Sequence, residues 1–236
     1  MTSNEDDATK DAIQYLLSME NIKSAIKDTE MRRRIDAMKT TFEATLVDSS
    51  LKLQNIMGCS VTTNEGRLMV CNILPPLNLI QTSDNIEEDV KNGLLVVLLT
   101  AIFLSINPVT PKPVSEAFVF KVLTEFGIDT ENEDVVFGDI KKLIAPLPSS
   151  EFVQKGWLNF CKAKGNETVE VLYSWGPRAV TCVDPMELLE TFCKMIDDPF
   201  PKLWKGHYTK AQIMQRDMHK FKVEMQGKEN ALRRLD

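Results

Sequence analysis

Residues 93–106 read GLLVVLLTAIFLSI, an almost uninterrupted apolar run directly preceded by the polar pair Lys91 and Asn92. At about 14 residues the run is shorter than the roughly 20 that a membrane-spanning helix needs. We therefore predict a helix buried in a protein core, from Ile86 to Ile106, and no membrane partner. Asn107-Pro108 ends it, because proline excludes the helical conformation from the residue before it.

The composition is that of an ordinary globular protein. The chain has 236 residues, of which 43% are hydrophobic and 26% charged, enough for one large domain or two small ones. The acidic residues 1–9 are expected to be disordered, and they resemble neither a secretory signal nor an Arg-rich transit peptide. The five cysteines are scattered, without a Cys-x-x-Cys pair, which argues against disulfides and zinc and favours a reducing compartment.

The charge is unevenly distributed. The net charge of −6 weakens the case for strong nonspecific nucleic-acid binding, which depends on Lys and Arg displacing counterions from phosphate. Acidic residues cluster at the start and at 84–89, whereas the last 35 or so residues are rich in Lys and Arg. We expect the basic end to be mainly a solvated helix face.

Residues 10–76 predict a first winged-helix domain. Three short helices are expected, around residues 13–20, 28–35 and 41–57, and Gly58 ends the third. Residues 59–63 and 68–73 then predict a β-hairpin, in which Gly66 can adopt the positive φ of the turn. Pro75-Pro76 closes this domain, and residues 77–89 form an acidic linker.

Residues 90–205 repeat that order. The apolar helix is followed by a second helix over about 113–126, ended by Gly127, and by a short third helix over 137–144. Residues 152–161 and 169–175 predict two strands, and Asp184-Pro185 begins a helix that runs to Met195. The predicted fold is therefore mainly α with small β-hairpins (α+β), as tandem winged-helix domains.

Residues 206–236 predict a basic amphipathic helix. Thr209 is a candidate N-cap, and Met214, Met218, Phe221 and Met225 form an apolar seam at alternating four- and three-residue steps. That seam could pack on its own domain or on a helix of a partner, and the sequence leaves both open.

Chemistry typical of an enzyme is not evident in the sequence. His207 and His219 lack neighbouring ligands and are expected on the surface, so no metal site is predicted. The chain has no glycine-rich phosphate loop, dinucleotide fingerprint or nucleophile elbow. We predict no cofactor, no small-molecule substrate and no catalytic activity of its own.

Four segments resemble the MAGE homology domain family. They are GLLVVLLTAIFL (93–104), FGDIKKLI (137–144), EFVQKGWL (151–158) and YSWGPRA (173–179), in that order. The resemblance covers about residues 10–205 and implies tandem winged helices, in agreement with the pattern above. A chain of this kind is most similar to the MAGE-type subunit of the structural-maintenance-of-chromosomes five/six complex. This implies a non-catalytic adaptor for genome maintenance and DNA repair that binds a RING-type ubiquitin-ligase subunit and a kleisin subunit and assists DNA contact. The expected location is the nucleus, with the cytoplasm as a second location.

The resemblance also suggests where partners bind. A dileucine in the first helix meets the RING partner in the family, and Leu16-Leu17 occupy that place. We favour an interface over a core position, because adjacent helical residues point about 100° apart and cannot both enter a narrow core stripe. The family's kleisin inserts an apolar helix into a groove of the second winged helix. Candidates for its lining, each of which could instead be core, are Val97, Ala101, Leu104, Phe118 and Val122.

Candidate phosphate contacts lie on the short helix of the second winged helix, on its hairpin, and just beyond the hairpin. They are Lys141, Lys142, Lys155, Lys162, Lys164 and Arg178. The same lysines could equally be scattered solubilising charges. Two further functions stay open: a free-standing winged-helix DNA-binding regulator, and a MAGE-type regulator of another ubiquitin ligase.

Overall fold

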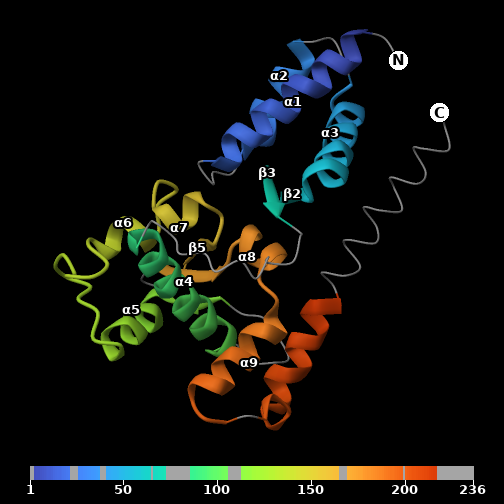
Figure 1. Cartoon of the computed structure of the whole chain (residues 1–236). Helices are drawn as coiled ribbons and strands as arrows, with labels where there is room; N and C mark the ends of the chain where they lie inside the picture. The colour runs from blue at the N-terminus through green and yellow to red at the C-terminus, as the bar shows by residue number, and fades with distance from the viewer. Residues whose placement is uncertain are drawn as a thin grey trace. The chain divides into compact units, whose positions relative to one another are not determined.

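The computed structural model describes residues 3–21, 26–37, 41–64, 66–72, 86–105, 113–164, 169–198 and 200–216. These residues form two compact units, the first made of residues 3–72 and the second of residues 86–216. In Figure 1 the first unit is blue to cyan and the second is green to red. Each unit has a hydrophobic core of its own.

The first unit combines three helices with a three-stranded antiparallel sheet. Its elements are α1 (Ser3–Asn21), β1 (Ile26–Lys27), α2 (Asp28–Ala37), α3 (Phe42–Met57), β2 (Cys59–Asn64) and β3 (Arg67–Asn72). The strand order is β1-β3-β2, and Val61 pairs with Val70 in the hairpin. Gly58 ends α3 in the left-handed conformation, with φ 64°, and Gly66 has φ 71° in the hairpin turn, as both glycines predicted.

The start of the first unit differs from the prediction. Residues 1–9 were expected to be disordered, but α1 already begins at Ser3. Ala8 and Thr9 are buried against the rest of the unit, and the Thr9 hydroxyl donates to Asp48 Oδ2 at 2.9 Å. Acidic residues such as Asp6 and Asp7 are favourable near a helix N-terminus, and the packing of Ala8 and Thr9 fixes this part of α1 on the unit.

The second unit repeats the same order of elements and extends it. It contains α4 (Ile86–Ser105), β4 (Val114–Ser115), α5 (Glu116–Glu125), α6 (Ile140–Ile144), α7 (Glu151–Gln154), β5 (Leu158–Lys164), β6 (Val169–Trp175), α8 (Pro177–Cys182), α9 (Pro185–Met195) and the 3₁₀ helix η1 (Pro201–Leu203). Residues 205–216 are also helical. The sheet order is β4-β6-β5, and Phe160 pairs with Tyr173.

Each unit has a helix, a short strand, further helices and a hairpin in that order, with the additional short helix α7 before the hairpin of the second unit. This order confirms the predicted mainly α fold with two winged-helix-like units. Two local predictions were wrong. The strand expected from Phe152 is the short helix α7 followed by β5, because Gly156, with φ 77°, turns the chain before the strand begins. Val114 lies in strand β4 rather than in a helix, and pairs with Tyr173.

The apolar run of residues 93–106 lies in α4, which crosses the core of the second unit. In the described part of the chain, no helix combines the length and apolarity needed to cross a membrane. A smaller cluster around Phe103, Leu189 and Ala211 joins the end of α4 to α9 and to the helix of residues 205–216.

Candidate partner-binding and nucleic-acid surfaces

Helix α4 presents two kinds of apolar position. Leu94, Leu95, Leu98, Leu99, Ile102 and Phe103 are buried in the second unit. The three positions predicted to contact a kleisin segment, Val97, Ala101 and Leu104, are each half-buried. Because residues at i, i+4 and i+7 share one helix face, they form a row beside the core rather than within it.

Helix α5 has a similar half-buried row. Its N-cap is Ser115, whose Oγ accepts from the Phe118 N–H at 3.3 Å. Val119 and Leu123 are buried, whereas the predicted partner contacts Phe118 and Val122 are half-buried. Helices α4 and α5 pack against each other in the second unit. A groove between their rows remains a prediction.

The carboxyl end of α4 is capped by side chains from the helix of residues 205–216. The last four carbonyls of a helix lack partners within it. Lys210 Nζ donates to the Phe103 carbonyl at 2.9 Å and lies 4.5 Å from the centre of the Phe103 ring. His207 Nε2 donates to the Leu104 carbonyl at 2.8 Å. Two of the four carbonyls thus accept hydrogen bonds from the helix of residues 205–216.

The packing of the helix of residues 205–216 on α4 contradicts the predicted surface position of His207. It also shows where the first residue of the predicted tail seam packs. His207 is half-buried and stacks near Phe103 and Trp204, so it is not a surface histidine; His219 lies outside the described residues. Met214 packs against the small cluster, which means that the described part of the tail seam packs on its own unit. Thr209 does not cap the helix, since its hydroxyl donates to the Lys205 carbonyl one turn earlier.

The cap on α4 has a stabilising and a destabilising component. A positive charge at a helix C-terminus interacts favourably with the helix dipole. Lys210 is only 7% exposed, however, and burial lowers its pKa to about 8. The sequence gives one signal for the buried contact, the spacing of Trp204, Tyr208 and Ala211 at i, i+4 and i+7, which places them on one helix face.

The dileucine is divided between the core and its edge. Leu16 is fully buried in the core of the first unit, whereas Leu17 is half-buried and packs against that core from the side. The preference for an interface over the core therefore fails for Leu16, because α1 packs against both α3 and β3 and places this position inward. Leu17, about 100° around the helix, keeps an accessible face.

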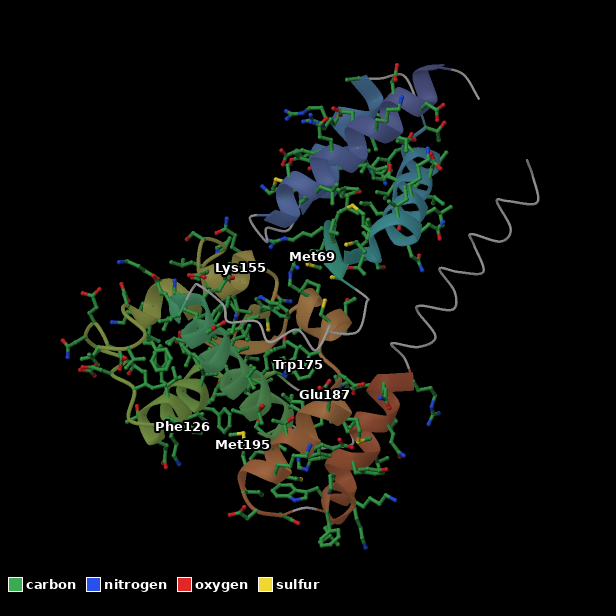
Figure 2. The ribbon with its side chains drawn as sticks, in the orientation of Figure 1. Met69, Phe126, Lys155, Trp175, Glu187 and Met195 are labelled. Atoms are coloured by element: carbon green, nitrogen blue, oxygen red, sulfur yellow. The ribbon has the colours of Figure 1, made fainter. Side chains whose placement is uncertain are left out.

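Only some of the lysines predicted to contact DNA have exposed side chains without an ion pair in the described part of the chain. Lys141 and Lys162 are exposed, and among the described residues no ion pair is found for either. Lys142 pairs with Asp139 at 3.7 Å but stays largely exposed. Lys155 Nζ lies 2.7 Å from Glu151 Oε1 and is half-buried (Figure 2). Lys164 ends β5, and its side chain lies outside the description.

Arg178 is a structural residue rather than a surface cation. Its side chain is 4% exposed, its Nε donates to the Lys155 carbonyl at 2.9 Å, and its guanidinium carbon lies 5.7 Å from the centre of the Trp157 ring. The expected phosphate contact is therefore corrected, since this guanidinium is held inside the unit by the segment that precedes β5.

An acidic segment lies between α5 and the exposed lysines. Residues 125–139 contain six Asp and Glu residues and no Lys or Arg. Backbone N–H groups that donate to Asp129 and Asp134 hold the pKa of both carboxyls below the usual value, so both stay ionised at neutral pH. Their negative field opposes phosphate binding at the neighbouring Lys141.

Within the described ranges, no group of three or more His, Cys, Asp or Glu residues could hold a metal ion. Every buried side-chain nitrogen and oxygen of those ranges has a hydrogen-bond partner. What the described residues present is a set of apolar rows and scattered charges, which suits recognition of other macromolecules.

Comparison with protein families matches the MAGE homology domain to residues 52–186. Melanoma-associated antigen D2 from Homo sapiens is 27% identical over 207 residues, which are 85% of this chain and 32% of that protein. The chain thus spans less than a third of this relative. The Non-structural maintenance of chromosomes element 3 homolog from Homo sapiens is 26% identical over 212 residues, 84% of this chain and 64% of that protein.

A solved structure is similar over both units. A chain of the structure named "Nse1-Nse3-Nse4 complex" superposes with a TM-score of 0.74 at 26% identity. The match covers 90% of this chain and 99% of that one, so it includes both units rather than a single winged helix.

Proposed function

Because this chain belongs to the MAGE homology domain family, we propose that it is a non-catalytic adaptor subunit of a structural-maintenance-of-chromosomes five/six complex. In this role it binds a RING-type ubiquitin-ligase subunit and a kleisin subunit, assists DNA contact, and acts in the nucleus in genome maintenance.

The observation that carries the proposal is the structural match to a chain of the Nse1-Nse3-Nse4 complex over nearly the full length of both chains. Homologues of element 3 of the non-structural maintenance of chromosomes group, at 25% and 26% identity, support the same assignment. A family domain that retains both winged-helix-like units can present two separate surfaces to two partners, as an adaptor requires.

For the RING-type partner we propose Leu17 as the contact and Leu16 as its support. Leu16 fixes α1 on the core, which orients the half-buried Leu17 beside it. Loss of the Leu16 side chain would cost about 2–5 kcal/mol of stability through the cavity it leaves. A double Leu16/Leu17 substitution would therefore confuse unfolding with loss of binding, and Leu17 alone is the informative position.

For the kleisin partner we propose the rows Val97-Ala101 on α4 and Phe118-Val122 on α5. Their half-burial leaves apolar surface beside a packed core, as the facing surface for an amphipathic helix requires. Leu104 contributes less, because it packs against the cluster formed with the 205–216 helix.

For DNA we propose a weak, sequence-independent contribution. Lys141, Lys142 and Lys162 are the exposed cations among the five candidates whose side chains are described. With about three phosphate contacts, the slope of log K against log salt would be about −3. Such binding helps a complex that has other DNA contacts but is weak for an isolated subunit.

The relatives support a second candidate. Melanoma-associated antigen E1 from Mus musculus is 28% identical over 203 residues, 84% of this chain and 21% of that protein, so identity alone does not separate the element 3 homologues from the other members. A MAGE-type regulator of a different ubiquitin ligase is therefore the alternative. A free-standing DNA-binding regulator is disfavoured by the small number of exposed cations among the candidate phosphate contacts and by the acidic segment of residues 125–139.

The proposal is tested by reconstitution with purified RING-type and kleisin subunits. Val97→Asp should weaken kleisin binding at least about tenfold and leave RING binding unchanged, since a buried charge at an apolar contact is unfavourable. Val96→Asp is the matched control: Val96 is the adjacent residue of α4, 44% exposed and on another helix face. Leu17→Ser should have the reverse selectivity.

Unchanged melting temperatures would show that the variants fold. Equal kleisin binding by the Val96 and Val97 variants would refute the proposed row. Failure of the unsubstituted chain to bind either subunit would refute the assignment to this complex and favour the alternative ligase.

A further inference from the structure

The segment after α9 displays a group of large apolar side chains that the proposed function does not use. Met195, Ile196, Phe200 and Leu203 are 66%, 46%, 63% and 67% exposed. They fall within nine residues, from the last residue of α9 to the end of η1, and we call them the apolar turn. Met195 is labelled at the end of α9 in Figure 2. Single exposed apolar residues are common, but four in one short turn indicate a binding surface.

The apolar turn is held in place by its own polar and aromatic contacts. Asp198 organises it: its N–H donates to the Cys193 carbonyl at 2.9 Å, its Oδ1 accepts from the Phe200 N–H at 3.3 Å, and its Oδ2 accepts from Trp204 Nε1 at 3.0 Å. Trp204 also packs edge-to-face on Phe192, with ring centres 5.3 Å apart. A surface ordered before binding loses little conformational entropy when a partner docks.

Positive charges border the apolar turn. Lys194, Lys202 and Lys205 are exposed, and within the described residues none of the three takes part in an ion pair. The turn also holds two acids, the exposed Asp197 and also Asp198, whose hydrogen bonds come from neutral N–H groups and do not cancel its charge. Three lysines against these two carboxylates leave residues 194–205 with a small net positive charge.

We propose that the apolar turn docks an acidic amphipathic helix of a partner protein, at a surface separate from the α4 and α5 rows. Apolar residues on one face of such a helix would cover Phe200 and Leu203, and its carboxylates would meet the lysine rim. Complementary charge at the rim of an apolar contact sets the choice of partner.

Other occupants fit less well. Nucleic acid would engage the lysines but leave four apolar side chains against phosphate and water. A second copy of this chain in a two-fold contact would bring the same lysines face to face, because such an interface uses one surface twice. Residues 217–236 carry five Lys and Arg residues against four acids, so they do not complement a positive rim.

The test is site-specific photo-crosslinking in the full chain, in cells that contain its native partners. Leu203 is replaced by photo-reactive benzoylphenylalanine, and the crosslinked segments are sequenced by mass spectrometry. We expect a segment of another protein with apolar residues at helical spacing and a net negative charge. Lys202→Glu combined with Lys205→Glu should lower the crosslinking yield at least about tenfold. Lys121→Glu, an exposed lysine of α5, is the matched charge control and should leave the yield unchanged.

The proposal is overturned if the crosslinked segment is basic, or if the crosslinks join residues 217–236, a second copy of the chain or nucleic acid. It is likewise overturned if the crosslinking yield is the same with and without the charge-reversing substitutions Lys202→Glu and Lys205→Glu. It is also overturned if position 203 crosslinks no more than position 180, where Val180 is 44% exposed on α8. An unchanged melting temperature of each variant excludes unfolding as the cause of a lost signal.

Discussion

Replacing Lys210 with methionine should abolish a pH dependence of stability that the buried amine creates. Burial lowers the pKa of Lys210 from 10.5 to about 8. Between these values the unfolded chain holds a proton that the folded chain has released, so the free energy of unfolding rises with pH. For one group with this shift, the rise between pH ~7.5 and pH ~9.5 is about 2 kcal/mol. Below pH ~7.5 both states are protonated and the contribution no longer changes.

The assay is urea denaturation at several pH values, followed by tryptophan fluorescence. All three tryptophans, Trp157, Trp175 and Trp204, belong to the second unit, so the signal reports on the unit that contains Lys210. Burial also raises the pKa of the Cys193 thiol, which lowers stability at alkaline pH. The difference between the unsubstituted chain and Lys210→Met isolates the lysine, because both contain that cysteine.

The expected outcome is a rising curve for the unsubstituted chain relative to the Lys210→Met variant, which lacks the amine but has a side chain of similar length. At neutral pH the variant should be at least as stable as the unsubstituted chain. Removing the buried charge offsets the lost hydrogen bond to the Phe103 carbonyl, worth about 1–3 kcal/mol. Parallel curves for the two proteins would refute the burial of a charged amine at the end of α4.

Three further substitutions test the second unit. Gly176→Ala would place a Cβ against the Gly156 carbonyl oxygen, closer than van der Waals contact allows, and this oxygen belongs to the backbone, so a loss of about 3 kcal/mol or more is expected in denaturant titrations; a loss under about 1 kcal/mol would contradict the close approach. Asp184→Ala removes the oxygen that caps α9 and should cost about 1 kcal/mol in thermal unfolding, whereas Asp184→Asn should retain most of it; equal losses would rule out capping. Tyr173→Phe deletes the hydroxyl that donates to the Ile144 carbonyl at 2.7 Å and should cost about 1–2 kcal/mol; an unchanged melting curve would mean that this buried bond contributes nothing.

Much of the fold follows from local signals in the sequence. The apolar run of 93–106 is long enough for a helix, and the glycines at 58 and 66 lie where the backbone requires a positive φ. Asp184-Pro185 combines a cap with a residue suited to the first helical position, and α9 begins there. Each of these signals lies within a few residues of the feature that it predicts.

The errors have a different origin. Residues 152–161 are rich in apolar and aromatic side chains, which favours a strand, yet Phe152 and Val153 are buried from the short helix α7. Arg178 is buried because the Lys155 carbonyl, 23 positions away, accepts from it. Leu16 and Leu17 are chemically identical, and only the packing of α1 on α3 and β3 divides them. Such outcomes depend on contacts between distant segments, which one sequence does not reveal.

The candidate sites were also predicted incompletely, because they depend on contacts between distant segments. The half-buried rows of α4 and α5 were suggested by the family resemblance, because the run of residues 93–106 is apolar nearly all round and its periodicity alone does not separate a core face from a groove. Lys210 looks like any other lysine of a basic tail, and its contact with α4 spans more than a hundred residues. The sequence gives the number of Lys and Arg side chains, but it does not show which of them form ion pairs in the folded protein.

The most direct test of the adaptor function is affinity purification of the full chain from native extract, with quantitative mass spectrometry of the bound proteins. Membership of the complex predicts co-purification of the RING-type and kleisin subunits in near-equal amounts with this chain, together with the two large chromosome-maintenance subunits, at salt concentrations that release DNA. Recovery of a different ubiquitin ligase, without the kleisin subunit, would contradict the proposal.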